Sequence, residues 1–125
     1  MALAQTKAAE IMQQNQETIT SHQVISLLLD GALERVAQAK SCIDTGNEED
    51  KIILIRKIVG IINGLRESLD FQNGGEIAVN LDELYVYMLK RIDDASPDSE
   101  SDVLTEVSGL INRVKSGWDQ IESQV

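Results

Sequence analysis

The sequence predicts an all-α protein, an antiparallel up-down four-helix bundle with an additional short N-terminal helix. The 125 residues include a single proline and only 3% aromatic residues, whereas the good helix formers Leu, Ala, Glu and Gln are abundant. Apolar residues also recur at helical spacing along most of the chain. We expect one domain over residues 1–125, with the bundle in residues 21–122 and a mobile or loosely docked segment in residues 1–20.

The first part of the chain divides into a weak and a strong helical pattern. Residues 3–16 are rich in Ala and Gln with few apolar side chains, which predicts a short amphipathic helix. Thr20 or Ser21 is expected to cap a second helix. Its apolar side chains repeat at helical spacing: Ile25, Leu28, Leu29, Ala32, Val36, Ala39 and Ile43. Gly46 is expected to end this helix, because glycine readily adopts the left-handed conformation that closes helices.

The third predicted helix, which extends to about Leu69, is unusually apolar. Asn47 is a suitable N-cap, and the three acidic residues that follow it suit the positive end of the helix dipole. Apolar residues cover most of the circumference and leave one narrow polar stripe. Two interpretations stay open: a helix surrounded by neighbours on all sides, or a helix whose second apolar face forms a groove for a partner helix.

Two further helices complete the expected bundle. Asn73-Gly74-Gly75 breaks the chain between segments of helical periodicity, which predicts a tight corner. The fourth helix is expected over about Glu76–Ala95, and a turn around Pro97 follows it. The fifth helix carries apolar side chains at helical spacing: Val103, Val107, Leu110, Ile111, Val114, Trp118 and Ile121. Short connections make consecutive helices antiparallel neighbours.

Composition excludes several classes of function. Asp and Glu outnumber Lys and Arg by 21 to 11, and the resulting net charge of −10 disfavours nucleic acids and anionic membrane surfaces as partners. One Cys and one His provide too few ligands for a zinc cluster, a di-iron site or bis-His haem, so we expect no metal and no cofactor. The sequence shows neither a secretory signal nor an apolar run that would span a membrane, which predicts a cytoplasmic protein without membrane insertion.

Enzymatic activity is not expected. The acidic residues gather at predicted helix ends and turns, and no glycine-rich phosphate loop occurs. One signalling alternative is histidine phosphotransfer through His22, since that class uses a four-helix bundle of similar length. The plainer interpretation makes His22 a surface or capping residue, because it lies in the first turn of its helix. A self-associating structural bundle is a further alternative.

The corner sequence is similar to a known family. The segment Ser68–Leu81 reads SLDFQNGGEIAVNL, and it is followed by LYVYM at Leu84–Met88 and by Arg91. This string resembles the signature of the flagellin export chaperones, the FliS family. Further matching blocks extend the resemblance over about residues 20–122: Leu28–Ala32, Glu106-Val107, Leu110-Ile111 and Trp118. The chain departs from the family in having Leu29 before Asp-Gly and no Tyr before Tyr85.

The resemblance implies a cytoplasmic helical bundle that serves flagellar type III export. Such a chaperone binds the C-terminal, disordered segment of flagellin, prevents its premature polymerisation and aids its delivery to the export gate. The resemblance thus also implies a component of the export gate as a partner. A divergent paralogue with a different cargo is an alternative, and a homodimer is conceivable when cargo is absent.

Two groups of residues are expected to serve this function. The cargo groove is predicted on the third and fourth helices, at Ile55, Ile58, Ile62, Leu84 and Met88. The family motif supplies residues with an expected structural role: Asp70, Gly74, Gly75, Asn80 and Tyr85. Here the glycines permit the tight corner, and Asp70 and Asn80 cap or cross-link the helices around it. Tyr85 and Tyr87 cannot share one helix face, so one is expected to pack inward. Trp118 is expected to anchor the core.

Overall fold

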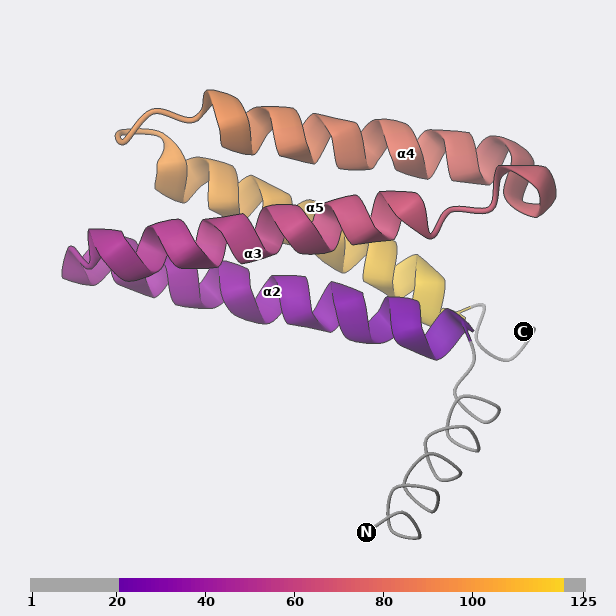
Figure 1. Ribbon diagram of the computed structural model, residues 1–125, viewed down its shortest axis with the longest axis horizontal. Helices are drawn as coiled ribbons and strands as arrows, with labels where there is room; N and C mark the ends of the chain where they lie inside the picture. Colours follow the sequence, from indigo (N-terminus) through magenta and orange to yellow (C-terminus); the bar gives the residue numbers. More distant parts are fainter. Residues whose placement is uncertain (1–20, 121–125) are drawn as a thin grey trace, which may run out of the picture.

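The computed structural model describes residues 21–120, which form four α-helices without a strand. Their bounds are α2 at Ser21–Thr45, α3 at Glu48–Glu67, α4 at Phe71–Asp94 and α5 at Glu100–Gln120. Consecutive helices run in opposite directions (Figure 1). These helices confirm the predicted all-α, up-down bundle. The predicted N-terminal helix and the proposed cap at Thr20 lie outside the described residues.

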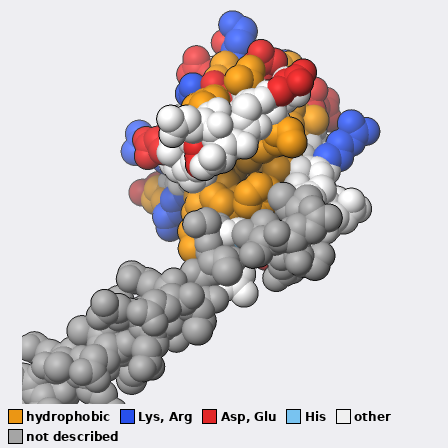
Figure 2. All heavy atoms as spheres, turned by 90° about the vertical axis from the view of Figure 1, so that its right-hand side faces the viewer, with side chains coloured by type: hydrophobic (Ala, Val, Ile, Leu, Met, Phe, Trp, Pro, Cys, Tyr) orange, Lys and Arg blue, Asp and Glu red, His pale blue; other side chains and the backbone are white. Residues whose placement is uncertain are grey.

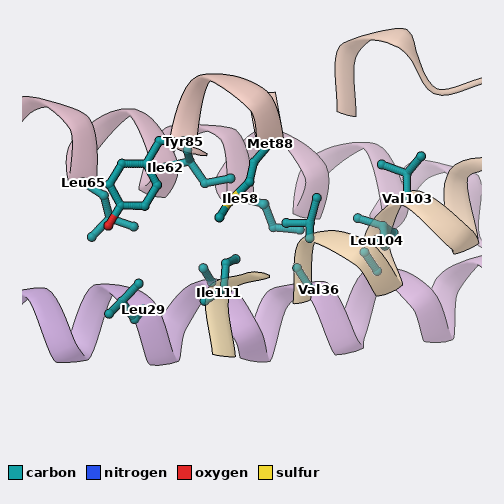
Figure 3. Close-up of a cluster of buried hydrophobic side chains, with 13 residues drawn as sticks. Leu29, Val36, Ile58, Ile62, Leu65, Tyr85, Met88, Val103, Leu104 and Ile111 are labelled. Atoms are coloured by element: carbon teal, nitrogen blue, oxygen red, sulfur yellow. The ribbon is translucent and has the colours of Figure 1, made fainter. Parts of the chain in front are cut away.

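The helices form a closed bundle around one apolar core. Each helix packs against its neighbours in chain order, and α2 also packs against α5. The buried side chains come from all four helices (Figure 3): Leu29, Ala32, Val36, Ala39, Ile58, Ile62, Leu65, Tyr85, Met88, Val103, Leu104, Val107 and Ile111. Burying a Leu, Ile or Val side chain in this way contributes about 1.5–3 kcal/mol.

Helix α3 is not surrounded on all sides. Ile58, Ile62 and Leu65 are buried, but Ile52 and Ile53 on another face are 42% and 46% exposed. Within the described residues α3 is therefore not enclosed on all sides, as the first interpretation required. A groove for a partner helix on its outer face stays a prediction.

The connection between α2 and α3 follows the sequence pattern closely. Gly46 has a φ of 74°, the left-handed conformation expected after a helix. The Asn47 side chain then accepts a hydrogen bond from the backbone N–H of Asp50 at 3.2 Å, which confirms Asn47 as the N-cap of α3. Acidic residues fill the first turn, where they suit the helix dipole.

The corner between α3 and α4 differs from the prediction in one detail. Helix α4 begins at Phe71 and not at about Glu76, because residues 71–74 already form a helical turn. Asp70 caps this turn by accepting hydrogen bonds from the backbone N–H groups of Gln72 and Asn73, both at 3.1 Å. Only Gly75, with φ 51° and ψ −124°, leaves the helical conformation. The predicted break is thus confined to one residue.

A buried ion-pair cluster fixes the end of the bundle where α3 and α5 begin. The Lys51 side chain is buried and its Nζ donates hydrogen bonds to Glu48 and, at 2.8 Å, to Glu100. The hydrogen bond to Glu100 and then the one to Glu48 raise the pKa of Lys51 against the effect of desolvation. This cluster holds the start of α5 against the start of α3 at one end of the bundle.

Candidate functional site

An apolar pocket of about 550 Å³ opens at the end of the bundle where α2 and α4 begin and α3 and α5 end. Figure 2 faces this end and shows hydrophobic side chains gathered in a hollow beside the α3–α4 corner. The lining residues come from all four helices and the corner: His22, Val24, Ile25, Leu65, Ser68, Leu69, Asp70, Gly74, Ile77, Ala78, Leu81, Tyr85 and Trp118.

The rim of the pocket exposes large aliphatic side chains to solvent. Ile77 at the start of α4 is 70% exposed, and Val24 at the start of α2 is 45% exposed. Leu81, one helical turn beyond Ile77, is partly buried and continues the apolar surface toward the core. A contiguous apolar surface of this kind is typical of a site that receives another apolar group.

Contacts between His22 and Trp118 join the start of α2 to the end of α5. His22 Nε2 donates a hydrogen bond to the Trp118 carbonyl, and Trp118 Nε1 donates one to the His22 carbonyl at 2.9 Å. The two rings are stacked, with centroids 4.8 Å apart and an angle of 5° between their planes. Trp118 packs against the core, as predicted.

Burial of His22 contradicts the phosphotransfer alternative. The side chain is only 2% exposed and its Nε2 is already engaged with the Trp118 carbonyl. A histidine that receives a phosphoryl group must be reachable by the donor protein, and this ring is covered by the indole. His22 is therefore neither a phosphotransfer residue nor the surface residue expected from the sequence.

Tyr85 reaches the pocket from the middle of α4. Its side chain is 2% exposed, whereas Tyr87 is 43% exposed, which confirms that one of the two tyrosines packs inward. Burial raises the pKa of Tyr85 to about 12, so its hydroxyl stays protonated at neutral pH. The hydroxyl has no hydrogen-bond partner among the described residues.

The corner contributes backbone and polar atoms to the pocket wall. A Cβ on Gly74 would lie 3.0 Å from the Ala78 Cβ, so glycine lets the corner lie tightly against α4. Asp70 borders the pocket from the cap position. Hydrogen bonds from the backbone and side chain of Asn73 lower the pKa of Asp70 below its ordinary value, so the cap is ionised at neutral pH.

The residues predicted to form the cargo groove do not line this pocket. Ile58, Ile62 and Met88 have no exposed surface and belong to the core. Ile55 and Leu84 are partly buried against the same core. Helical periodicity identified all five as members of an apolar face, but it did not reveal that neighbouring helices cover that face.

The motif residues assigned a structural role lie at or near the pocket instead. Asp70, Gly74 and Tyr85 line it, and Gly75 forms the corner beside it. Asn80 is exposed within α4, away from both helix ends, so it does not act as a cap. Sequence reasoning missed the rim residue Ile77. The available signal was that Ile77 is the first large apolar residue after the two glycines.

Neither a metal centre nor a membrane span is found within residues 21–120. No three His, Cys, Asp or Glu side chains of residues 21–120 gather as metal ligands would. No helix in this range combines the length and apolarity needed to cross a bilayer.

Comparisons with known proteins agree with the motif. Residues 4–125 match the family described as flagellar protein FliS. The chain is 50% identical over 100 residues to the flagellar secretion chaperone FliSB of Pseudomonas aeruginosa, covering 80% of this chain and 79% of that protein. It is 39% identical to the flagellar secretion chaperone FliS of Salmonella typhimurium (80% and 75% covered) and 38% identical to that of Vibrio cholerae (80% and 74% covered). The chain belongs to the FliS family of flagellar secretion chaperones.

Proposed function

We propose that this protein is a cytoplasmic chaperone for flagellin and that it binds the C-terminal segment of flagellin at the apolar pocket. The observation that carries the proposal is the exposed apolar rim, with Ile77 70% exposed beside a pocket of about 550 Å³. The names of the relatives, which are flagellar secretion chaperones, support a flagellar cargo. We place the site here and not at Ile58, Ile62 and Met88, whose side chains offer no accessible surface.

Binding at such a pocket requires no chemical step. A disordered, amphipathic segment folds as it binds, and its apolar face fills the pocket while its polar face remains in water. The segment is then unavailable for polymerisation with other flagellin molecules, and the complex can be delivered to a component of the export gate. Burial of apolar surface gives binding a markedly negative heat-capacity change.

The acidic composition suits a protein with an exposed apolar site. A net charge of −10 makes copies of the chain repel one another and opposes association through their pockets. The proposal therefore expects a monomer at moderate concentration. Dimerisation through the pocket in the absence of cargo would appear as a concentration-dependent mass that flagellin reduces.

A charge placed at the rim should abolish binding without unfolding the protein. We expect Ile77→Asp to weaken binding of a flagellin C-terminal peptide at least tenfold, because the carboxylate would have to be desolvated against apolar groups. Ile77 is largely exposed in the free protein, so helicity and thermal stability should change little. Isothermal titration calorimetry and circular dichroism measure the two effects.

Ile53→Asp is the matched control. Ile53 is 46% exposed on α3 and does not line the pocket, so this substitution should leave peptide affinity unchanged. Equal losses in both variants would show that cargo binds over a wider surface and would contradict the placement. Failure of the unaltered protein to bind flagellin would overturn the proposed cargo and favour a paralogue with a different one.

A further inference from the structure

We propose that the Tyr85 hydroxyl is the polar anchor of the pocket and donates a hydrogen bond to a side-chain oxygen on the otherwise apolar face of the bound cargo helix. This inference rests on the proposed function, since it names what the same pocket recognises in its cargo. It assigns to Tyr85 a role in specificity in addition to its role in the core.

Tyr85 lines the pocket, and its hydroxyl has no hydrogen-bond partner among residues 21–120. Its side chain is 2% exposed and lines the pocket. Figure 3 shows its ring directed away from Met88 and lying beside Leu65, which also lines the pocket. Within residues 21–120 no group accepts a hydrogen bond from the hydroxyl. A ligand that fills the pocket removes water from this hydroxyl, and a polar group that loses water without gaining a hydrogen bond weakens binding, so the hydroxyl points to a partner on the ligand.

His22 provides a second, independent observation on the same pocket. A carbonyl oxygen only accepts hydrogen bonds, so Nε2, which bonds to the Trp118 carbonyl, carries the ring proton. The other ring nitrogen, Nδ1, is buried without a partner in the described part of the chain. Two polar atoms of residues that line the pocket, the Tyr85 hydroxyl and His22 Nδ1, thus lack a partner among residues 21–120.

The chemistry of the pocket limits which groups of the cargo can accept a hydrogen bond from Tyr85. Burial keeps the phenol protonated at neutral pH, with a pKa of about 12, so the hydroxyl acts as a donor. The backbone carbonyls of a helical cargo are engaged in the helix itself, which makes the acceptor a side chain. A carboxylate would lose its hydration in an apolar pocket of a strongly acidic protein. The acceptor is therefore an Asn, Gln, Ser or Thr side chain.

Tyr85→Phe tests the anchor, because it keeps the ring and removes only the hydroxyl. We expect affinity for a flagellin C-terminal peptide to fall about five- to tenfold, as for the loss of one hydrogen bond. The thermal midpoint of the free protein should change little, because the hydroxyl makes no hydrogen bond within residues 21–120. A merely structural role would instead lower the thermal midpoint together with the affinity, and that result would overturn the inference.

Tyr87→Phe is the matched control. The Tyr87 hydroxyl donates to Glu106 at 2.9 Å and lies outside the pocket, so its loss should leave peptide affinity unchanged.

A double-mutant cycle identifies the acceptor on the peptide. When each Asn, Gln, Ser and Thr of the peptide is replaced by Ala in turn, one replacement should weaken binding to the unaltered protein and have no further effect on Tyr85→Phe.

Three outcomes distinguish a failure of this inference from a failure of the proposed function. If Ile77→Asp abolishes binding but Tyr85→Phe binds as tightly as the unaltered protein, the pocket is the cargo site and Tyr85 is not its anchor. The absence of any coupled replacement in the peptide would likewise overturn the side-chain acceptor. If the unaltered protein does not bind the peptide at all, the proposed function fails and the inference fails with it.

Discussion

Single side chains determine how the open end of the bundle is held together. The reciprocal hydrogen bonds of His22 and Trp118 join residues 96 positions apart in the chain. Asp70 ends the α3–α4 connection with two backbone hydrogen bonds. These contacts surround the pocket, so the residues that shape it also stabilise the fold.

The charge of Asp70 should make a pH-dependent contribution to stability. Because the folded-state pKa lies below the ordinary value of 3.8, ionised Asp70 stabilises the fold at all pH values above 3.8. This contribution is lost as the pH falls through the folded-state pKa. We expect Asp70→Asn to lower the thermal midpoint at pH 7, and the difference from the unaltered protein to shrink at pH values below 3.8.

Asp70→Ala provides the comparison for the cap itself. Asn retains a side-chain oxygen that accepts the backbone hydrogen bonds, whereas Ala does not, so Ala should be the more destabilising of the two at pH 7. Equal thermal midpoints for the two variants would show that the charge, and not the capping geometry, accounts for the whole effect.

At the scale of helices, the corner between α3 and α4 decides the course of the chain. The helical turn at residues 71–74 and the main body of α4 are joined through Gly75, whose φ of 51° and ψ of −124° suit glycine alone. The bend brings Ile77 and Leu81 of α4 beside the pocket. One residue therefore sets the position of the apolar rim.

A side chain at Gly75 should strain this corner. We expect Gly75→Ala to lower the free energy of unfolding by about 1–3 kcal/mol, because alanine rarely adopts this backbone conformation. Chemical denaturation measures the change. Gly60→Ala is the control within α3, where an added Cβ meets nothing within 4 Å. It should raise the free energy of unfolding by about 0.5–1 kcal/mol. A loss at both positions would argue against backbone strain as the cause.

At the scale of the whole molecule, the two ends of the bundle differ. The buried Lys51 cluster joins the starts of α3 and α5 at one end. At the other end the stacked His22 and Trp118 rings join α2 to α5, and the pocket opens beside the α3–α4 corner. The asymmetry leaves an open apolar pocket at one end without removing the core that holds the helices together.

The single tryptophan reports on this open end. The chain contains one Trp, and Trp118 lines the pocket, so its fluorescence should change when cargo fills the pocket. We expect a shift of the emission maximum to shorter wavelength as water is displaced from the indole. A titration with the flagellin peptide should give the same dissociation constant by fluorescence as by calorimetry. An unchanged spectrum at saturating peptide would place the cargo away from this end.

The sequence by itself determined the helices and most of their ends. The spacing of apolar residues predicted the four helices of the described range, and local chemistry predicted the stop at Gly46 and the cap at Asn47. These features depend on residues close together in the chain, so a linear pattern contains them. The motif around Gly74 and Gly75 resembled the signature of the FliS family, and the comparisons confirmed this resemblance.

Only the tertiary structure decided which apolar surface is covered and which is open. Periodicity places Ile58 and Ile77 alike on apolar helix faces, but it does not say where a neighbouring helix ends. Ile58 lies within the bundle and is fully buried, whereas Ile77 lines the open pocket and is 70% exposed. His22 likewise became buried through Trp118, 96 positions away. Burial is a property of the assembled helices, and for this reason the pocket emerged only from their packing.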